Sequence, residues 1–200
     1  MKTLLQINSS LHSAAGQSSV LATQFAERWL NATSGGKVVV RDLAMNPPAH
    51  LTAERFQAFL TPPGERTEEQ AVFAATSDEL IDELRTADAV VIGLPMYNFG
   101  IPSTLKAWID HVARAGATFK YTEKGPVGLL ADRPVWLFAA RGGQYRNTPR
   151  DTQSAYMTHF LNFIGIRNIE FVYAEGLALG DDSRRQSLDG ARRSINRLAA

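Results

Sequence analysis

Apolar and polar residues follow two different periods along this chain. Short, nearly continuous apolar runs are typical of strands buried on both faces. They cover Thr3–Ile7, Val38–Val40, Ala89–Leu94, Val135–Ala140 and Ile169–Tyr173. Amphipathic segments with helical spacing lie between or after these runs, at Ser18–Asn31, Glu68–Arg85, Ser103–Arg114, Asp151–Ile164 and Ser187–Leu198.

A chain in which strands alternate with helices forms βαβ units around a parallel sheet. We therefore expect an α/β fold, namely a doubly wound three-layer sandwich with a five-stranded parallel sheet. Proline-rich stretches at 46–48 and 61–64 predict loops on either side of a short helix near Thr52–Leu60. No linker or repeat divides the chain, so residues 1–200 are expected to form one domain.

Composition argues against several classes of function. The net charge is +1, so no bulk field favours nucleic acid or an anionic membrane as a partner. The absence of cysteine excludes disulfides, thiolate metal sites and thiol nucleophiles. The four histidines lack the spacing of metal ligands, and we expect His111 on a helix surface. The chain starts without a signal-peptide pattern and has no apolar stretch that would span a bilayer, which predicts a cytoplasmic protein.

A serine-rich loop follows the first predicted strand. In a doubly wound fold, ligands bind at the carboxyl ends of the strands, beside the point where the strand order reverses. The loop contains Ser10 and Gly16-Gln17-Ser18 and runs directly into a helix. Hydroxyls and N–H groups at a helix N-terminus suit a phosphate, although Ser18 as a simple helix cap explains the same pattern. Neither G-x-G-x-x-G nor G-K-[ST] occurs here, which disfavours a Rossmann-type dinucleotide site and a nucleotide triphosphatase.

The third predicted strand ends in an uncharged loop, LPMYNFGIP, at residues 94–102. Its four central residues, Met96, Tyr97, Asn98 and Phe99, cannot all point inward. Aromatic rings pack on the face of a planar heteroaromatic ligand while an amide bonds to its edge. This composition favours a ligand site over the alternative, a hydrophobic plug that covers the end of the sheet.

The fourth predicted strand ends in Ala140-Arg141-Gly142-Gly143. The glycine pair allows the backbone to approach a ligand closely, and we expect Arg141 to supply a positive charge at the same rim. A flexible turn that carries a surface arginine explains these residues equally well.

Four motifs share one resemblance. They are Met96-Tyr97-Asn98-Phe99, the segment VARAGATFKYT at 112–122, the Arg141-Gly142-Gly143 turn, and FLNFIGI at 160–166. Together they resemble the FMN-dependent NADH azoreductases, quinone-reducing flavoproteins of the flavodoxin-like superfamily, over nearly the whole chain. The resemblance implies a homodimer with FMN at the subunit boundary. It also implies hydride transfer from NADH or NADPH to the flavin, and then from the flavin to an azo compound or a quinone.

The resemblance also assigns cofactor residues. Ser10, Gly16, Gln17 and Ser18 would hold the FMN phosphate, Met96 to Phe99 would flank the isoalloxazine, and Ala140 to Gly143 would lie along its edge. Relatives often carry a serine at position 140, so the alanine here removes a hydroxyl contact. The flavin loops contain no carboxylate, and Arg141 would favour an anionic reduced flavin. Hydride transfer between stacked rings needs no side-chain nucleophile, so we expect no catalytic side chain.

Other aromatic residues are expected to bind the substrate. Residues 117–122 alternate like a hairpin arm outside the core sheet, and a monomer would leave Phe119 or Tyr121 exposed. By the resemblance, Phe119, Tyr121 and Phe163 roof the neighbouring subunit's flavin and sandwich the acceptor; folding back into local core is the alternative. Tyr145 lies in the segment 144–149, which, with the segment 56–66, is individual to this chain and is expected to set substrate preference.

Two other functions stay open. A flavodoxin-type one-electron carrier is usually more acidic than this nearly neutral chain. A non-catalytic flavin-binding protein would hold a flavin that NADH and NADPH do not reduce.

Overall fold

The structure is a computed structural model that describes residues 1–198, so the last two residues of the predicted domain lie outside the described residues. Its main sheet has five parallel strands in the order β2-β1-β3-β6-β7. They are β1 (Thr3–Asn8), β2 (Lys37–Asp42), β3 (Ala89–Pro95), β6 (Val135–Ala140) and β7 (Ile169–Ala174). This order and the parallel pairing confirm the predicted doubly wound sheet.

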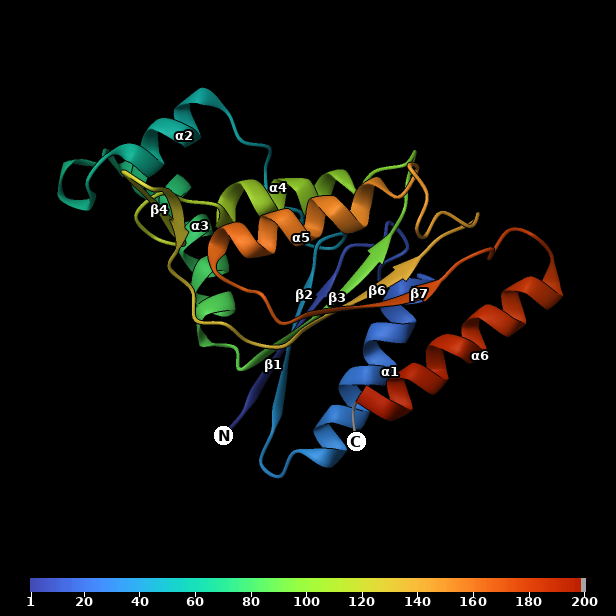
Figure 1. Cartoon of the computed structure of the whole chain (residues 1–200). Coiled ribbons are helices and arrows are strands. Elements are labelled where there is room, and N and C mark those ends of the chain that lie inside the picture. The colour runs from blue at the N-terminus through green and yellow to red at the C-terminus, as the bar shows by residue number, and fades with distance from the viewer. Residues whose placement is uncertain (199–200) are drawn as a thin grey trace.

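Helices cover both faces of the sheet, which gives the three predicted layers (Figure 1). One face carries α1 (Gln17–Ala32) and α6 (Asp181–Leu198), and the other carries α3 (Glu68–Thr86), α4 (Ser103–Val112) and α5 (Thr152–Ile164). The short helix α2 (Ala53–Leu60) packs on α3, and short 3-10 turns cover Ser13–Ala15 and Pro63–Glu65. Among residues 1–198, no helix has both the length and the apolar character needed to cross a membrane.

Two elements extend beyond the sequence prediction. Helix α6 begins at Asp181 rather than at the predicted Ser187. The prediction missed its first turns because they are polar on every side and show no apolar stripe. The predicted hairpin arm is confirmed as β4 (Phe119–Thr122), and its antiparallel partner is β5 (Gly125–Gly128). Pro126 argues against a strand at this point of the sequence, yet proline is tolerated in an edge strand such as β5.

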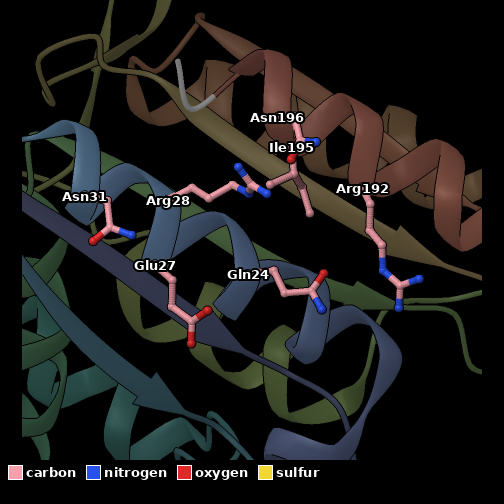
Figure 2. A pocket seen from close by; sticks show the side chains of 7 residues that line it. All are labelled: Gln24, Glu27, Arg28, Asn31, Arg192, Ile195 and Asn196. Carbon is pink, nitrogen blue, oxygen red and sulfur yellow. The ribbon is translucent and has the colours of Figure 1, made fainter.

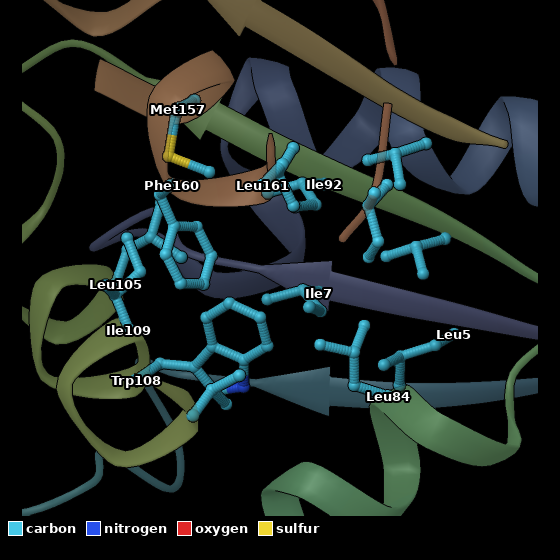
Figure 3. Close-up of a cluster of buried hydrophobic side chains, with 14 of the residues drawn as sticks. Leu5, Ile7, Leu84, Ile92, Leu105, Trp108, Ile109, Met157, Phe160 and Leu161 are labelled. Carbon is cyan, nitrogen blue, oxygen red and sulfur yellow. The ribbon is translucent and has the colours of Figure 1, made fainter. Parts of the chain in front are cut away.

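Two apolar clusters fill the spaces between the sheet and the helices. Leu5, Ile7 and Ile92 of the central strands pack against Trp108 of α4 and Phe160 of α5 (Figure 3). On the other face, Leu4 joins a cluster in which Phe25 of α1 contacts Trp136, with ring centroids 4.5 Å apart. Successive strand residues enter opposite clusters because side chains alternate between the two faces. Burial on both faces therefore explains the continuous apolar runs.

His111 is fully buried, so its predicted place on a helix surface was wrong. Its Nε2–H donates to the carbonyl oxygen of Ala49 at 2.9 Å, and its ring meets Phe59 edge to face at 5.6 Å. Burial lowers the pKa of His111. The loop before α2 and α2 itself cover this side of α4, a contact that no local pattern in the sequence marks.

The turn before β6 fixes backbone ends that are far apart in the sequence. Arg133 is buried and donates to three carbonyl oxygens at the C-terminus of α3, which have no partners within the helix. Asp132 Oδ1 accepts the N–H groups of Arg133, Arg167 and Asn168 at 2.8 to 3.0 Å. These two neighbouring side chains thus link β6 to α3 and to the loop that enters β7.

We expect Asp132→Ala to lower the stability of the protein in a pH-dependent way. The N–H groups of Arg167 and Asn168 lower the pKa of Asp132 below its ordinary value, so the folded state favours the carboxylate. The stabilisation is present above about pH 4 and is lost as the pH falls through the folded pKa. At pH 7, the melting temperature of Asp132→Ala should lie below that of the wild type, and the difference between the two should be smaller at pH 3.

Asp182→Ala is the matched control, because Asp182 is exposed and, within residues 1–198, forms an ion pair with Arg185 alone, one turn along α6. Its melting temperature should stay near that of the wild type at both pH values. If the melting temperature of Asp132→Ala lies below that of the wild type by the same amount at both pH values, the stabilising role of the Asp132 carboxylate is contradicted.

Candidate functional site

The carboxyl ends of β1, β3 and β6 lie side by side at one edge of the sheet, where the strand order reverses between β1 and β3. Hydrogen bonds join the three loops that leave this edge. Tyr97 Oη lies 3.3 Å from Ser10 Oγ and accepts the N–H of Leu11 at 3.2 Å. The N–H of Met96 donates to the carbonyl oxygen of Ala140 at 3.1 Å. The structure therefore brings the three predicted ligand loops together.

The serine-rich loop forms a polar cradle at the N-terminus of α1. Ser10 is buried, and a Cβ at Gly16 would lie 2.1 Å from Ser10 Oγ, so only glycine admits the hydroxyl here. Gly16 is also the N-cap of α1 and makes no side-chain cap. Ser18 is not the cap, which removes the simpler interpretation of that serine. Instead, Ser18 Oγ is buried and has no hydrogen-bond partner within residues 1–198.

The backbone of the same helix turn adds further donors. The first intrahelical bond runs from the N–H of Val20 to the carbonyl oxygen of Gly16 at 2.9 Å. The N–H groups of Gln17, Ser18 and Ser19 therefore have no acceptor inside the helix. Three N–H donors, two hydroxyls and the positive end of the helix dipole fit an oxyanion with several oxygen atoms.

Helix α1 reaches this edge because Gly93 of β3 has no side chain. A Cβ at Gly93 would lie 3.1 Å from the backbone of Ser18, so a larger residue would push the helix away from the sheet. Ser9 Oγ donates to the carbonyl oxygen of Gly93 at 2.7 Å and holds the start of the loop to the same strand. The cradle is thus attached directly to the central strands.

The Met96–Phe99 loop contains a tight and strained turn. The N–H of Tyr97 donates to the carbonyl oxygen of Gly100 at 3.1 Å, and the N–H of Gly100 donates back to Tyr97 at 2.9 Å. Asn98 and Phe99 between them have φ values of +50° and +63°, as in a type I′ turn. Glycine is the usual second residue of such a turn, and a phenylalanine there costs about 1–2 kcal/mol. The turn leaves the Phe99 side chain 51% exposed, directed away from the core.

Arg141 does not carry a free charge at the rim, and that prediction was wrong. Its side chain has no exposed surface, and its guanidinium pairs with Asp151 at 2.7 Å and with Glu175 at 3.1 Å. The ring of Tyr173 lies 5.1 Å from the guanidinium carbon. Burial alone raises the pKa of Asp151, but hydrogen bonds from Arg141 and Ser154 outweigh it and lower that pKa. Two carboxylates therefore neutralise the arginine.

The rest of the loop after β6 stays close to the edge. The carbonyl oxygens of Gly142 and Gly143 accept N–H groups of the loop after β7 at 3.0 and 2.8 Å. The Tyr145 N–H donates to Glu175 Oε1 at 2.8 Å, and the Tyr145 ring meets Phe99 edge to face at 5.6 Å. Tyr145 and Phe99, predicted for substrate and cofactor respectively, thus form one aromatic pair.

The other three predicted substrate residues lie elsewhere in the chain. Phe119 packs on Phe163 at 4.2 Å and on Tyr121 at 5.5 Å between ring centroids. Phe163 belongs to the last turn of α5, so this group sits beside the C-terminal end of that helix, where β4 lies in Figure 1. Phe99 bonds to Thr152 at the N-terminal end of α5 and pairs there with Tyr145. A helix of this length separates its ends by roughly 20 Å. One chain therefore does not bring these aromatics to the loops at the sheet edge.

Two residues that the sequence analysis did not single out hold the strained turn. Thr152 Oγ1 donates to the carbonyl oxygen of Phe99, and Gln153 Nε2 donates to those of Pro95 and Gly100. The sequence did contain a sign of the role of Gln153, which occupies the apolar stripe of α5 one turn before the buried Met157. A buried amide in such a stripe needs partners.

Comparisons with known proteins agree with this fold. The family model described as the flavodoxin-like fold matches residues 1–198. The FMN-dependent NADH:quinone oxidoreductase of Cellvibrio japonicus is 54% identical over 200 residues, which is all of both chains. An enzyme of the same name from Alcanivorax borkumensis is 50% identical over 96% of this chain and 97% of its own.

Solved structures give the same result. An azoreductase from Bacillus anthracis str. Sterne has a TM-score of 0.91 at 29% identity, over 100% of this chain and 99% of that one. An FMN-dependent NADH-azoreductase from Bacillus anthracis str. Ames Ancestor, solved in complex with FMN, has a TM-score of 0.88 at 27% identity over both whole chains. This chain therefore belongs to the flavodoxin-like family of the FMN-dependent NADH:quinone oxidoreductases.

Proposed function

We propose that this protein binds FMN at the carboxyl edge of its sheet, takes hydride from NADH, and reduces quinones or azo compounds. The observation that carries the proposal is the buried Ser18 hydroxyl, which has no partner within residues 1–198 and lies in a cradle beside an uncharged aromatic loop. The relatives' names supply the cofactor and the donor.

The cradle at α1 suits the phosphate of FMN. Ser10 Oγ, Ser18 Oγ and the N–H of Gln17 would donate to it, and the helix dipole would favour its charge. Gly16 keeps this space open next to Ser10. One such cradle matches the single terminal phosphate of FMN, and the sequence shows no adenine pocket of the kind that FAD would need.

The aromatic loops suit the flavin ring and its reaction partners. When bound, FMN accepts a hydride and passes it to a second substrate. Met96 to Phe99 would flank the ring, and the backbone from Ala140 to Gly143 would run along its edge. The paired rings of Phe99 and Tyr145 would exclude water from one side of the site. Arg141 would act here through its hydrogen bonds to the protein, since its charge is already paired.

We propose a homodimer as the working form. Two apolar pockets, of about 530 and 470 Å³, lie at the two ends of α4. Phe99 and Tyr156 line the first, and Phe56 and Tyr121 line the second. Exposed apolar area of this kind marks interfaces. A second copy would also bring the exposed Tyr121, with Phe119 and Phe163 packed behind it, to a neighbouring site that it does not reach in its own chain.

The proposed function has a direct test. Purified protein should release FMN on denaturation, and NADH should bleach the bound flavin under anaerobic conditions. Donor and acceptor need the same aromatic face, so one must leave before the other binds, and reciprocal plots should be parallel. Mostly FAD in the released flavin, or a bound flavin that neither NADH nor NADPH reduces, would rule the proposal out. Converging plots for every acceptor would rule out the shared face.

Ser18→Ala should weaken FMN binding at least tenfold, because a hydrogen bond to a charged group is lost. The same change removes a buried hydroxyl without a partner, so the melting temperature of the apo-protein should not fall. Flavin fluorescence titration and thermal melting measure the two effects. Ser19→Ala is the matched control, since the Ser19 hydroxyl is also buried and has no partner in the described part of the chain but lies one position further around the helix. Equal losses in the two variants would contradict the role of Ser18.

Tyr121→Ala should change quinone reduction far more than stability. Tyr121 is 74% exposed, so its own chain gains little from it. Phe119→Ala is the comparison variant, because Phe119 is buried against Phe163 and its loss should cost about 3–5 kcal/mol. Light scattering gives the mass, and melting and turnover are measured side by side. A monomeric wild type, or a Tyr121→Ala variant with unchanged turnover for every acceptor, would refute the shared site.

A further inference from the structure

We infer that Gln153 is a positioning residue, whose buried side-chain amide fastens both ends of the loop Met96–Gly100 to helix α5. The inference concerns the loop proposed above to flank the flavin, and it rests on that proposed function for the ligand used in its test. Gln153 itself belongs to α5 and acts through the backbone of the loop.

The hydrogen bonds of Gln153 reach the two ends of the loop at once. Nε2 donates to the carbonyl oxygen of Pro95, the last residue of β3, at 2.8 Å and to that of Gly100 at 3.0 Å. The side chain is buried, with 1% of the residue exposed. Both acceptors are carbonyl oxygens, so the nitrogen rather than the oxygen of the amide must face them.

Within its own residues, the loop forms few hydrogen bonds that hold its shape. Pro95 and Pro102 lack N–H groups, and the turn inside the loop closes with one pair of bonds between Tyr97 and Gly100. An isolated hairpin of this size is not stable in water. The positive φ values of Asn98 and Phe99 raise its energy further. Strain of this kind persists only where surrounding groups impose it, and Gln153 supplies two of the bonds that do so.

Helix α5 is a rigid support for this contact. Asp151 caps it by accepting the N–H of Ser154 at 3.1 Å, and the same carboxylate pairs with the buried Arg141. One turn further on, Met157 is fully buried in the core cluster. The amide therefore ties a strained loop to an element that is fixed at its cap and along its buried side.

The apolar replacement Gln153→Leu tests this role. Leucine has a similar volume but donates no hydrogen bond, so the carbonyl oxygens of Pro95 and Gly100 lose their shared donor. Gln24→Leu is the matched control, since Gln24 lies in the polar groove between α1 and α6, beside Arg28 and Arg192 (Figure 2). It makes the same chemical change on a helix face away from the loop.

Two readouts are compared, FMN affinity by fluorescence quenching and amide hydrogen exchange of residues 97–100 in the apo-protein. We expect Gln153→Leu to weaken FMN binding about tenfold, as for the loss of two ordinary hydrogen bonds. Exchange at 97–100 should rise at least tenfold while α5 stays protected. Gln24→Leu should match the wild type in both.

Unchanged exchange at 97–100 in Gln153→Leu would overturn the inference, as would loss of protection along α5 to the same extent. If Gln153→Leu does not fold, Gln153→Asn decides. Its amide is one methylene shorter and can bond to at most one of the two carbonyl oxygens, so exchange should rise, and wild-type exchange there would equally overturn the inference. A wild type that binds no FMN would defeat the proposed function, whereas the exchange comparison on the apo-protein would still test Gln153.

Discussion

The buried guanidinium of Arg141 lies at the carboxyl end of β6 and pairs with two partly buried carboxylates, Asp151 and Glu175. A buried charge is tolerated only when its partners are held in place, so this cluster joins β6, the loop after β7 and the cap of α5. The N–H of Tyr145 also donates to Glu175, and Thr152 of α5 donates to the strained turn at Phe99. The positions of Phe99 and Tyr145 therefore depend on the Arg141 guanidinium, although it does not contact either ring.

The two halves of the edge are built by opposite means. Around α1, donors outnumber acceptors: Ser18 Oγ and the first N–H groups of the helix lack protein partners within residues 1–198. Around the Phe99 turn, the backbone carbonyl oxygens are satisfied by α5, and the exposed surface is apolar and uncharged. A ligand with an anionic end and a flat ring complements both halves, and Tyr97 Oη links them through Ser10. The donors around α1 are thus left without partners in the described chain, whereas contacts with α5 hold the strained turn.

Helix α5 separates the aromatic residues into two groups. Phe99 and Tyr145 pair near its N-terminus, while Phe119, Tyr121 and Phe163 pack near its C-terminus. Within the second group, Phe119 is buried and Tyr121 is largely exposed. The expected alternatives, local core or roof over a neighbouring site, therefore apply to different residues of one short strand. The inward residue supports its own chain, and the outward residue remains available for another.

The sequence alone determined the layers and the strands, because buried parallel strands need the continuous apolar runs that Ala89–Leu94 and Val135–Ala140 display. It also located the three loops that are predicted to bind the ligand, since strand ends at a switch point follow from the order of elements. Only the tertiary structure decided which side of a local motif meets solvent. Arg141 and His111 are buried because Glu175 and the Ala49 loop, distant in sequence, close over them. Gln153 matters because its carbonyl acceptors belong to another element. Hydrophobic periodicity reports how much surface an element buries, whereas a polar partner is chosen by contacts between elements that periodicity does not encode.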